Sequence, residues 1–164
     1  MTDKPTIHIL GSGALGSLWA AKLSAKNNVV LLIKSSKINP NNKTHHFQFI
    51  DQDKTTRFAL PCETSNASSA SHAPIDILLV FTKSYDTVTA VQQIKNRITP
   101  ASSIVLFQNG MGSQQAITEL LPSNTVIAAS TTEGANRSND QTIIYAGKGE
   151  TWLGAISNNP RNNT

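Results

Sequence analysis

The stretch Gly11-Ser12-Gly13-Ala14-Leu15-Gly16 directly follows the apolar run Thr6–Leu10 and opens an alanine-rich helical pattern. In this context each glycine has its own use. Gly11 permits a tight turn from strand to helix, and Gly13 lets phosphates approach the main chain. Gly16 allows the helix to lie close on the strand, while the N–H groups and positive end of the helix face an anion. The pattern predicts dinucleotide binding; the alternative is a glycine turn that only packs a helix on a sheet.

Length and composition are those of an ordinary soluble globular domain. The chain has 164 residues, 15% charged and 38% hydrophobic, with a net charge of +4. Its Lys and Arg residues are scattered, so we expect no nucleic-acid or membrane patch. The single cysteine, Cys62, excludes an internal disulfide and a multi-cysteine metal site. No segment is apolar over a membrane-spanning length, and a strand beginning by residue 6 leaves no room for a signal peptide. We therefore predict a cytoplasmic protein without a metal.

Short apolar runs alternate with helical patterns along most of the chain. This order favours βαβ units and an α/β fold: a Rossmann-type, doubly wound and mainly parallel sheet. A small antiparallel hairpin is expected near the end. The strands are predicted at Thr6–Leu10, Val29–Ile33, Ile75–Phe81, Ser103–Phe107 and Thr125–Ser130, and the helices at Ala14–Ala25, Val88–Ile98 (closed by Pro100) and Gln114–Leu121.

Three other stretches depart from this alternation. Lys43–Leu60 is predicted to be an inserted hairpin, and residues 63–73 a short helix plus loop. Gln141–Gly154 is predicted to form two antiparallel strands around Gly147-Lys148-Gly149. Residues 1–156 would then be one dinucleotide-binding domain, and residues 157–164, which contain no apolar side chain, a polar linker or tail.

The end of the second strand indicates which dinucleotide is preferred. A fold that selects NAD usually has Asp or Glu here to bind the ribose 2′-hydroxyl, but this chain has Lys34-Ser35-Ser36-Lys37. A lysine attracts the 2′-phosphate that an acid would repel, so Lys34 or Lys37 favours NADP over NAD. The alternative is that both are solvated lysines without a ligand.

Polar residues also follow the later strands, where a doubly wound sheet binds its ligands. Lys83 can reach the position of a nicotinamide ring. A lysine without a ligand here would be mildly unfavourable, because the helix dipole repels cations at the N-terminus of a helix. Asn109, within Gln108-Asn109-Gly110-Met111-Gly112, could bind the cofactor's ribose or a substrate, although Asn-Gly is also a common turn. Ser130–Ala135 is polar and small, and could line the same cleft.

Together these stretches resemble the ketopantoate reductase (2-dehydropantoate 2-reductase) family. The resemblance rests on Gly11–Trp19, Lys83, the loop at residues 108–112, and Thr131–Ala135 with the following strands Tyr145–Gly154, and it covers residues 6 to 156. Asn-Gly-Met-Gly is a more specific marker than the glycine fingerprint.

The resemblance implies NADPH-dependent reduction of 2-dehydropantoate to pantoate, a step toward pantothenate and coenzyme A. It places Gly11, Ser12, Gly13, Ala14, Leu15, Gly16, Lys83, Asn109 and Ala135 around the cofactor, with Lys83 and Asn109 nearest the substrate. Where the family often has arginine, this chain has Lys34, which lacks the bidentate fork. The NADPH affinity is therefore in question.

The family also has a helical carboxy-terminal domain that supplies its catalytic lysine and glutamate. We find no match to that domain here, so we predict no catalytic residue within this chain, and a 2-keto acid and the missing domain as its partners. Apolar surface left without that domain suggests self-association, such as a homodimer. Two other readings remain: a reductase of another 2-keto acid, and a non-catalytic dinucleotide sensor.

Overall fold

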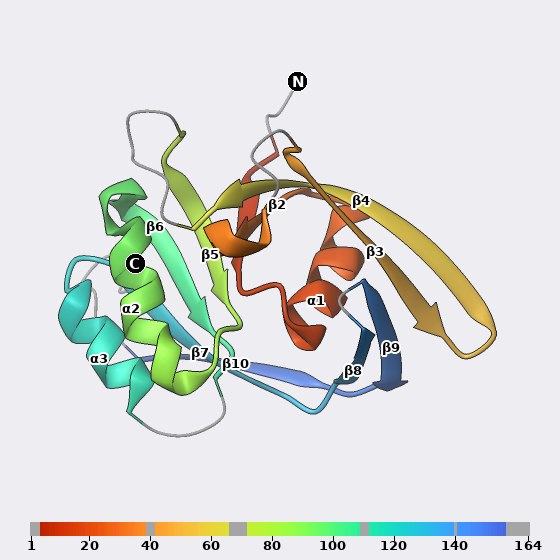
Figure 1. Ribbon diagram of the computed structural model, residues 1–164. Helices are drawn as coiled ribbons and strands as arrows, with labels where there is room; N and C mark the ends of the chain where they lie inside the picture. Colours follow the sequence, from red (N-terminus) through yellow and green to blue (C-terminus); the bar gives the residue numbers. More distant parts are fainter. Residues whose placement is uncertain (1–3, 39–41, 66–71, 109–111, 140, 157–164) are drawn as a thin grey trace.

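The chain folds around one ten-stranded sheet with helices on both faces (Figure 1). The computed structural model describes residues 4–38, 42–65, 72–108, 112–139 and 141–156. The strands are β1 (Thr6–Leu10), β2 (Asn28–Ile33), β3 (Thr44–Asp51), β4 (Lys54–Thr64), β5 (Ile75–Val80), β6 (Ile98–Leu106), β7 (Thr125–Thr131), β8 (Gly134–Asn139), β9 (Thr142–Gly147) and β10 (Thr151–Ala155), and the helices are α1 (Ala14–Ser24), α2 (Ser84–Ile94) and α3 (Ser113–Leu120).

The sheet order is β10-β7-β6-β5-β1-β2-β4-β3-β9-β8. Strand β1 pairs in parallel with β2 on one side and β5 on the other, and β5, β6 and β7 continue in parallel. The chain thus reverses its direction of winding at β1. The predicted Rossmann-type fold is confirmed, and its ligand crevice is expected beyond the carboxyl ends of β1 and β5.

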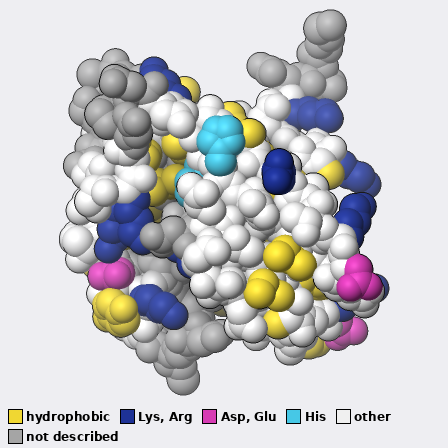
Figure 2. Space-filling model, turned by 45° about the vertical axis from the view of Figure 1, so that its right-hand side comes forward, with side chains coloured by type: hydrophobic (Ala, Val, Ile, Leu, Met, Phe, Trp, Pro, Cys, Tyr) yellow, Lys and Arg dark blue, Asp and Glu magenta, His cyan; other side chains and the backbone are white. Residues whose placement is uncertain are grey.

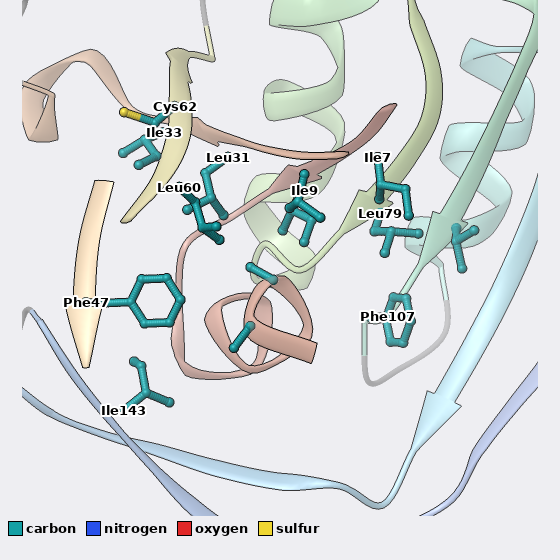
Figure 3. Packing of buried hydrophobic residues seen from close by; sticks show 14 of the residues in the cluster. Ile7, Ile9, Leu31, Ile33, Phe47, Leu60, Cys62, Leu79, Phe107 and Ile143 are labelled. Atoms are coloured by element: carbon teal, nitrogen blue, oxygen red, sulfur yellow. The ribbon is translucent and has the colours of Figure 1, made fainter. Parts of the chain in front are cut away.

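Two apolar clusters fill the space between the sheet and the helices. The α1 face buries Ile9 and Leu31, whereas the α2 and α3 face buries Leu10 and Leu78. Neighbouring residues of β1 therefore point to opposite faces, as they do in a strand covered on both sides. Figure 3 shows side chains from several strands directed toward α1 at the centre of the first cluster. This packing fixes the end of α1 that faces the crevice.

The predicted inserted hairpin is present as β3 and β4. The two strands are antiparallel around a turn in which Gln52 has φ 51°. The end of β4 pairs with β2, and β3 pairs in parallel with β9, which forms an antiparallel hairpin with β8. Through this extension the hairpin brings β8 and β9 beside α1 (Figure 1).

Two local predictions are wrong, and a third is only partly tested. The second helix ends at Ile94, and Pro100 lies inside β6, between the paired residues Ile98 and Ser103, where a register shift removes the need for its N–H. For the short helix plus loop predicted at residues 63–73, residues 63 and 64 instead belong to β4; residues 66–71 lie outside the described part, so the helix there stays a prediction. The strands on either side of Gly147-Lys148-Gly149 do not pair with each other, because β9 pairs with β8 and β10 with β7.

On the face shown in Figure 2, Lys and Arg side chains are spread over separate places rather than gathered in one patch. No helix in the described ranges is long and apolar enough to cross a membrane. On β10, at one edge of the sheet, Trp152 and Leu153 are exposed. These two side chains form the apolar part of that edge.

Candidate functional site: a dinucleotide cavity at the end of strand β1

The turn between β1 and α1 has a geometry that only glycine allows at two positions. Gly11 has φ +106°, and a Cβ there would lie 3.0 Å from main-chain atoms of Phe81 and Thr82. A Cβ on Gly16 would lie 2.0 Å from the carbonyl oxygen of Gly11. The loop therefore folds tightly between α1 and the end of β5, as the sequence predicts for these two glycines.

Gly13 is different, because a Cβ at this position would meet nothing within 4 Å. It is exposed and is the N-cap of α1, where no side chain of the described residues caps the helix. The first turn of the helix carries no acidic residue. Its main-chain N–H groups and the positive end of its dipole are thus directed at open space, which is the arrangement that a phosphate requires.

A cavity of about 270 Å³ lies in front of this loop. It is bounded by the ends of β1, β2 and β5 and by the start of α2, at the point where the winding of the sheet reverses. The structure brings five predicted site residues together there: Gly11, Ser12, Gly13, Lys34 and Lys83. Lys37 also lines this cavity, whereas Ala14, Leu15 and Gly16 lie in the first turn of α1 behind it.

Lys34 is at the end of β2, as predicted, but it is not a lone cation. Its Nζ lies 3.7 Å from Oδ2 of Asp86 on α2. The Lys34 side chain is 66% exposed and that of Asp86 is 43% exposed, so water screens this ion pair strongly. The Asp86 carboxylate nevertheless lines the same cavity, where its negative charge would repel an anionic ligand. The sequence analysis did not single out Asp86.

Lys83 is the N-cap of α2 and is exposed at the rim of the cavity. Its carbonyl accepts a hydrogen bond from Oγ1 of Thr87 at 3.0 Å, and the Thr87 hydroxyl also contacts Oγ1 of Thr82 at 2.9 Å. Thr87 is fully buried. These bonds hold the backbone of Lys83, whose exposed side chain lines the cavity.

Gln108 connects the ends of β5 and β6. Its side-chain Nε2 donates to the carbonyl of Val80 at 3.0 Å and to that of Thr82 at 3.3 Å. Gln108 is buried, so these bonds hold the β5 end against the β6 end at the crevice. The predicted residue Asn109 follows directly, and lies outside the described residues.

Strand β8 carries the predicted site residue Ala135 and also Arg137, which the sequence analysis did not single out. The side chain of Ala135 packs against the core cluster around α1. Arg137 lies two residues further along the same strand. Its Nη2 donates to the carbonyl oxygen of Ser12 at 2.6 Å. Residues two apart in a strand share a face, so both point toward α1 and the glycine loop. The sequence of residues 134–139 shows no alternation of apolar and polar side chains, so it did not indicate a strand.

Other reactive side chains give little sign of covalent or metal chemistry. Burial raises the pKa of the Cys62 thiol, which disfavours the thiolate that a reactive cysteine needs. Among the residues that the structure describes, no three His, Cys, Asp or Glu side chains form a group able to hold a metal ion. The site thus offers main-chain N–H groups and cations for binding an anionic ligand.

These features define the class of protein: a Rossmann-type α/β domain with a glycine-rich loop at the switch point of its sheet. Residues 7–158 match the family described as "Ketopantoate reductase PanE/ApbA". The chain belongs to this family.

Curated relatives agree with this assignment. The chain is 31% identical to the 2-dehydropantoate 2-reductase of Halobacterium salinarum, over 89% of this chain and 48% of the relative. It is 30% identical to the Vibrio cholerae enzyme of the same name, over 92% and 47%. The chain thus spans about half the length of these curated relatives.

The fold is shared with several solved structures. A Methylococcus capsulatus 2-dehydropantoate 2-reductase superposes with a TM-score of 0.75 at 21% identity, over 96% of this chain and 52% of that one. A D-mandelate dehydrogenase in complex with NADH and anilino(oxo)acetate gives 0.79 at 23% identity, over 90% and 47%. At these identities the likeness establishes the fold alone.

Proposed function

We propose that this chain is the cofactor-binding part of an NADPH-dependent reductase that converts 2-dehydropantoate to pantoate. The observation that carries the proposal is the loop at Gly11–Gly16, which aims the uncapped start of α1 at a cavity lined by Lys34, Lys37 and Lys83. Relatives named 2-dehydropantoate 2-reductase support the choice of substrate.

Each part of the cavity has a task in this proposal. The main-chain N–H groups at Gly13 and the first turn of α1 hold the pyrophosphate, because they are uncapped and unobstructed. Bound nicotinamide dinucleotide supplies the hydride for the keto carbon of the substrate. Lys83, which follows the end of β5 and lines the cavity, would stabilise negative charge near the reacting end, and we propose the predicted residue Asn109 as a second polar group for the same task.

The location of the site can be tested by hydrogen exchange. We expect NADPH to protect the amides of residues 11–17 and 82–86, which surround the cavity, and to leave the turn at residues 52–53 unchanged. Protection confined to other segments would contradict the proposed site. Because the readout is local, it is independent of turnover.

The substrate needs a separate measurement. We expect no turnover from this chain alone. When the carboxy-terminal domain of the family is also present, NADPH consumption should rise on adding 2-dehydropantoate and much less on adding benzoylformate, the keto acid that corresponds to mandelate. The reverse preference would assign the protein to another 2-keto acid while keeping the dinucleotide site.

We also propose a homodimer, supported by the exposed Trp152 and Leu153 on β10; a monomeric mass at high concentration would argue against it.

A further inference from the structure

A second and larger cavity, of about 400 Å³, adjoins the first one on the side of β3. Four residues line both cavities: Ser12, Ile33, Lys37 and Arg137. Ile33 lies beside Cys62 at one end of the core cluster in Figure 3, and both form part of the wall. This cavity therefore opens directly off the glycine loop and the end of β2.

The lining of the larger cavity is positively charged. Its described lining residues include two cations, Lys37 and Arg137, together with the imidazoles of His45 and His46, and no Asp or Glu. Nε2 of His45 is buried and has no hydrogen-bond partner among the residues that the structure describes. A buried polar atom of this kind is usually satisfied by a ligand or water. The cavity thus suits an anion with several oxygen atoms.

Arg137 is the best placed of these cations. Its Nη2 donates to the Ser12 carbonyl at 2.6 Å, which anchors the guanidinium at the edge of the glycine loop. The side chain is half-buried and lines both cavities. A guanidinium carries five donors in a rigid fork, and this fork matches the geometry of a phosphate monoester.

Lys34 is a weaker candidate for the same anion. It lines only the first cavity, where Asp86 lies 3.7 Å from its Nζ. The ion pair offsets part of its charge, and solvent screens the rest because the side chain is mostly exposed. Its ammonium group is also a point charge without the fork of arginine.

We infer that Arg137 and Lys37, rather than Lys34, bind the 2′-phosphate of the dinucleotide, in the larger cavity. The inference rests on the proposed function, which supplies the dinucleotide. Strand β8 would thus provide the guanidinium that the end of β2 lacks. Arg137 would be a specificity-determining residue, since only NADP carries the phosphate that it contacts.

The test compares ligands that differ only in this phosphate. The protein and its variants are titrated calorimetrically with NADPH and NADH, and with adenosine 2′,5′-bisphosphate and 5′-AMP. For Arg137→Met we expect an affinity loss of about tenfold or more for the two ligands with a 2′-phosphate, the size of a charge-assisted hydrogen bond. NADH and 5′-AMP should lose about twofold at most. Arg137→Lys should be intermediate, because it keeps the charge but not the fork.

Two further variants serve as comparisons. Lys34→Met should weaken NADPH binding by less than about threefold, as expected of a screened ion. Arg57→Met removes an exposed arginine of β4 that lines neither cavity, and should change nothing. Retained NADH binding in Arg137→Met shows that the variant is folded.

The outcomes separate the inference from the proposed function. Equal losses for NADPH and NADH in Arg137→Met would overturn the inference, because Arg137 would then only hold Ser12 in place. A larger loss of NADPH binding in Lys34→Met than in Arg137→Met would also overturn it. Both results leave dinucleotide binding intact. A wild-type protein that binds neither dinucleotide would overturn the proposed function and the inference together.

Discussion

The main chains of Gly11 and Gly16 approach so closely that a Cβ on Gly16 would lie 2.0 Å from the carbonyl oxygen of Gly11. No side chain fits in this space, and the obstructing atom is backbone rather than a flexible side chain. The contact brings the first turn of α1 against the turn that leaves β1. It therefore sets the direction in which the start of the helix faces the cavity.

The first prediction separates structural from functional glycines in this loop. Gly16→Ala should destabilise the protein by about 3 kcal/mol or more, because the clash requires backbone movement in a packed region. Gly13→Ala should leave the free energy of unfolding nearly unchanged, since its Cβ would face open space, yet weaken NADPH binding by about tenfold or more.

Urea denaturation and NADPH titration of both variants provide the check. A Gly13→Ala protein that binds NADPH as tightly as the wild type would contradict the placing of the pyrophosphate at this residue. A Gly16→Ala protein of wild-type stability would show that the loop is looser than its geometry indicates.

The second prediction concerns Asp86, the acidic residue that lines the cavity in front of the glycine loop. Asp86→Asn removes a negative charge that opposes a bound pyrophosphate, so it should tighten binding of both NADPH and NADH, by about twofold to fivefold at low salt. The gain should shrink as salt is added, because both charges are largely exposed. Calorimetric titration at two ionic strengths measures it. Asp53→Asn, in the exposed turn between β3 and β4, is the matched control and should have no effect. Unaltered affinities in Asp86→Asn would mean that no phosphate lies near this carboxylate.

The third prediction concerns a buried polar group on the opposite side of the sheet from α1. Arg97 is 2% exposed and donates from Nη1 to Oε2 of Glu63 at 2.8 Å, while its Nη2 lies 3.3 Å from Nε2 of His8. Arginine is only a donor, so His8 Nε2 must be the unprotonated acceptor. Burial and then the charge of Arg97 lower the pKa of His8 below its usual 6.5.

A histidine with a lowered pKa stabilises the fold above its unfolded-state pKa and loses that contribution as the pH falls. Below 6.5 the unfolded chain takes up a proton that the folded protein resists, so the free energy of unfolding should fall as the pH drops further. In His8→Gln the slope between pH about 7.5 and about 5.5 should be shallower. A residual slope is expected from His45, whose pKa is also lowered, mainly by burial. An identical slope in wild type and variant would refute the role of His8.

The fourth prediction concerns the ion pair between Lys22 at the end of α1 and Glu133 just before β8. The Lys22 ammonium also lies 4.9 Å from the centre of the Tyr145 ring on β9. The Glu133 side chain is 11% exposed and that of Lys22 38%, so the pair is partly screened. A double-mutant cycle with Lys22→Met and Glu133→Gln should give a coupling free energy of about 0.5–1 kcal/mol, measured by urea denaturation. A coupling of zero would mean that this pair does not help to hold the β8–β9 hairpin on α1.

The parts of the fold that the sequence predicts are those with strong local signals. The β1–α1–β2 unit, the central strand β5 and the β3–β4 hairpin combine apolar runs with glycine, asparagine or charged turns. The glycine loop and the strand-end lysines Lys34 and Lys83 are predictable for the same reason, because the end of a parallel strand is a known place for ligands.

The remaining features depend on contacts between distant segments. Strand β8 has the polar sequence Gly134–Asn139, and it is a strand because β9 pairs with it and α1 packs beside it. Arg137 enters the site only through that pairing, 125 residues away from Ser12 in the sequence. Asp86 reaches Lys34 because the first turn of α2 and the end of β2 line the same cavity. No local pattern carries information of this kind.

The most direct test of the account is calorimetric titration of the wild-type protein with NADPH and with NADH, at low and at moderate salt. The account predicts that both dinucleotides bind, that NADPH binds at least about tenfold more tightly, and that this preference narrows as salt screens the 2′-phosphate. Binding of neither dinucleotide would contradict the central claim that the loop at Gly11–Gly16 is a cofactor site. Equal binding of both would retain that site and remove the assignment to NADPH.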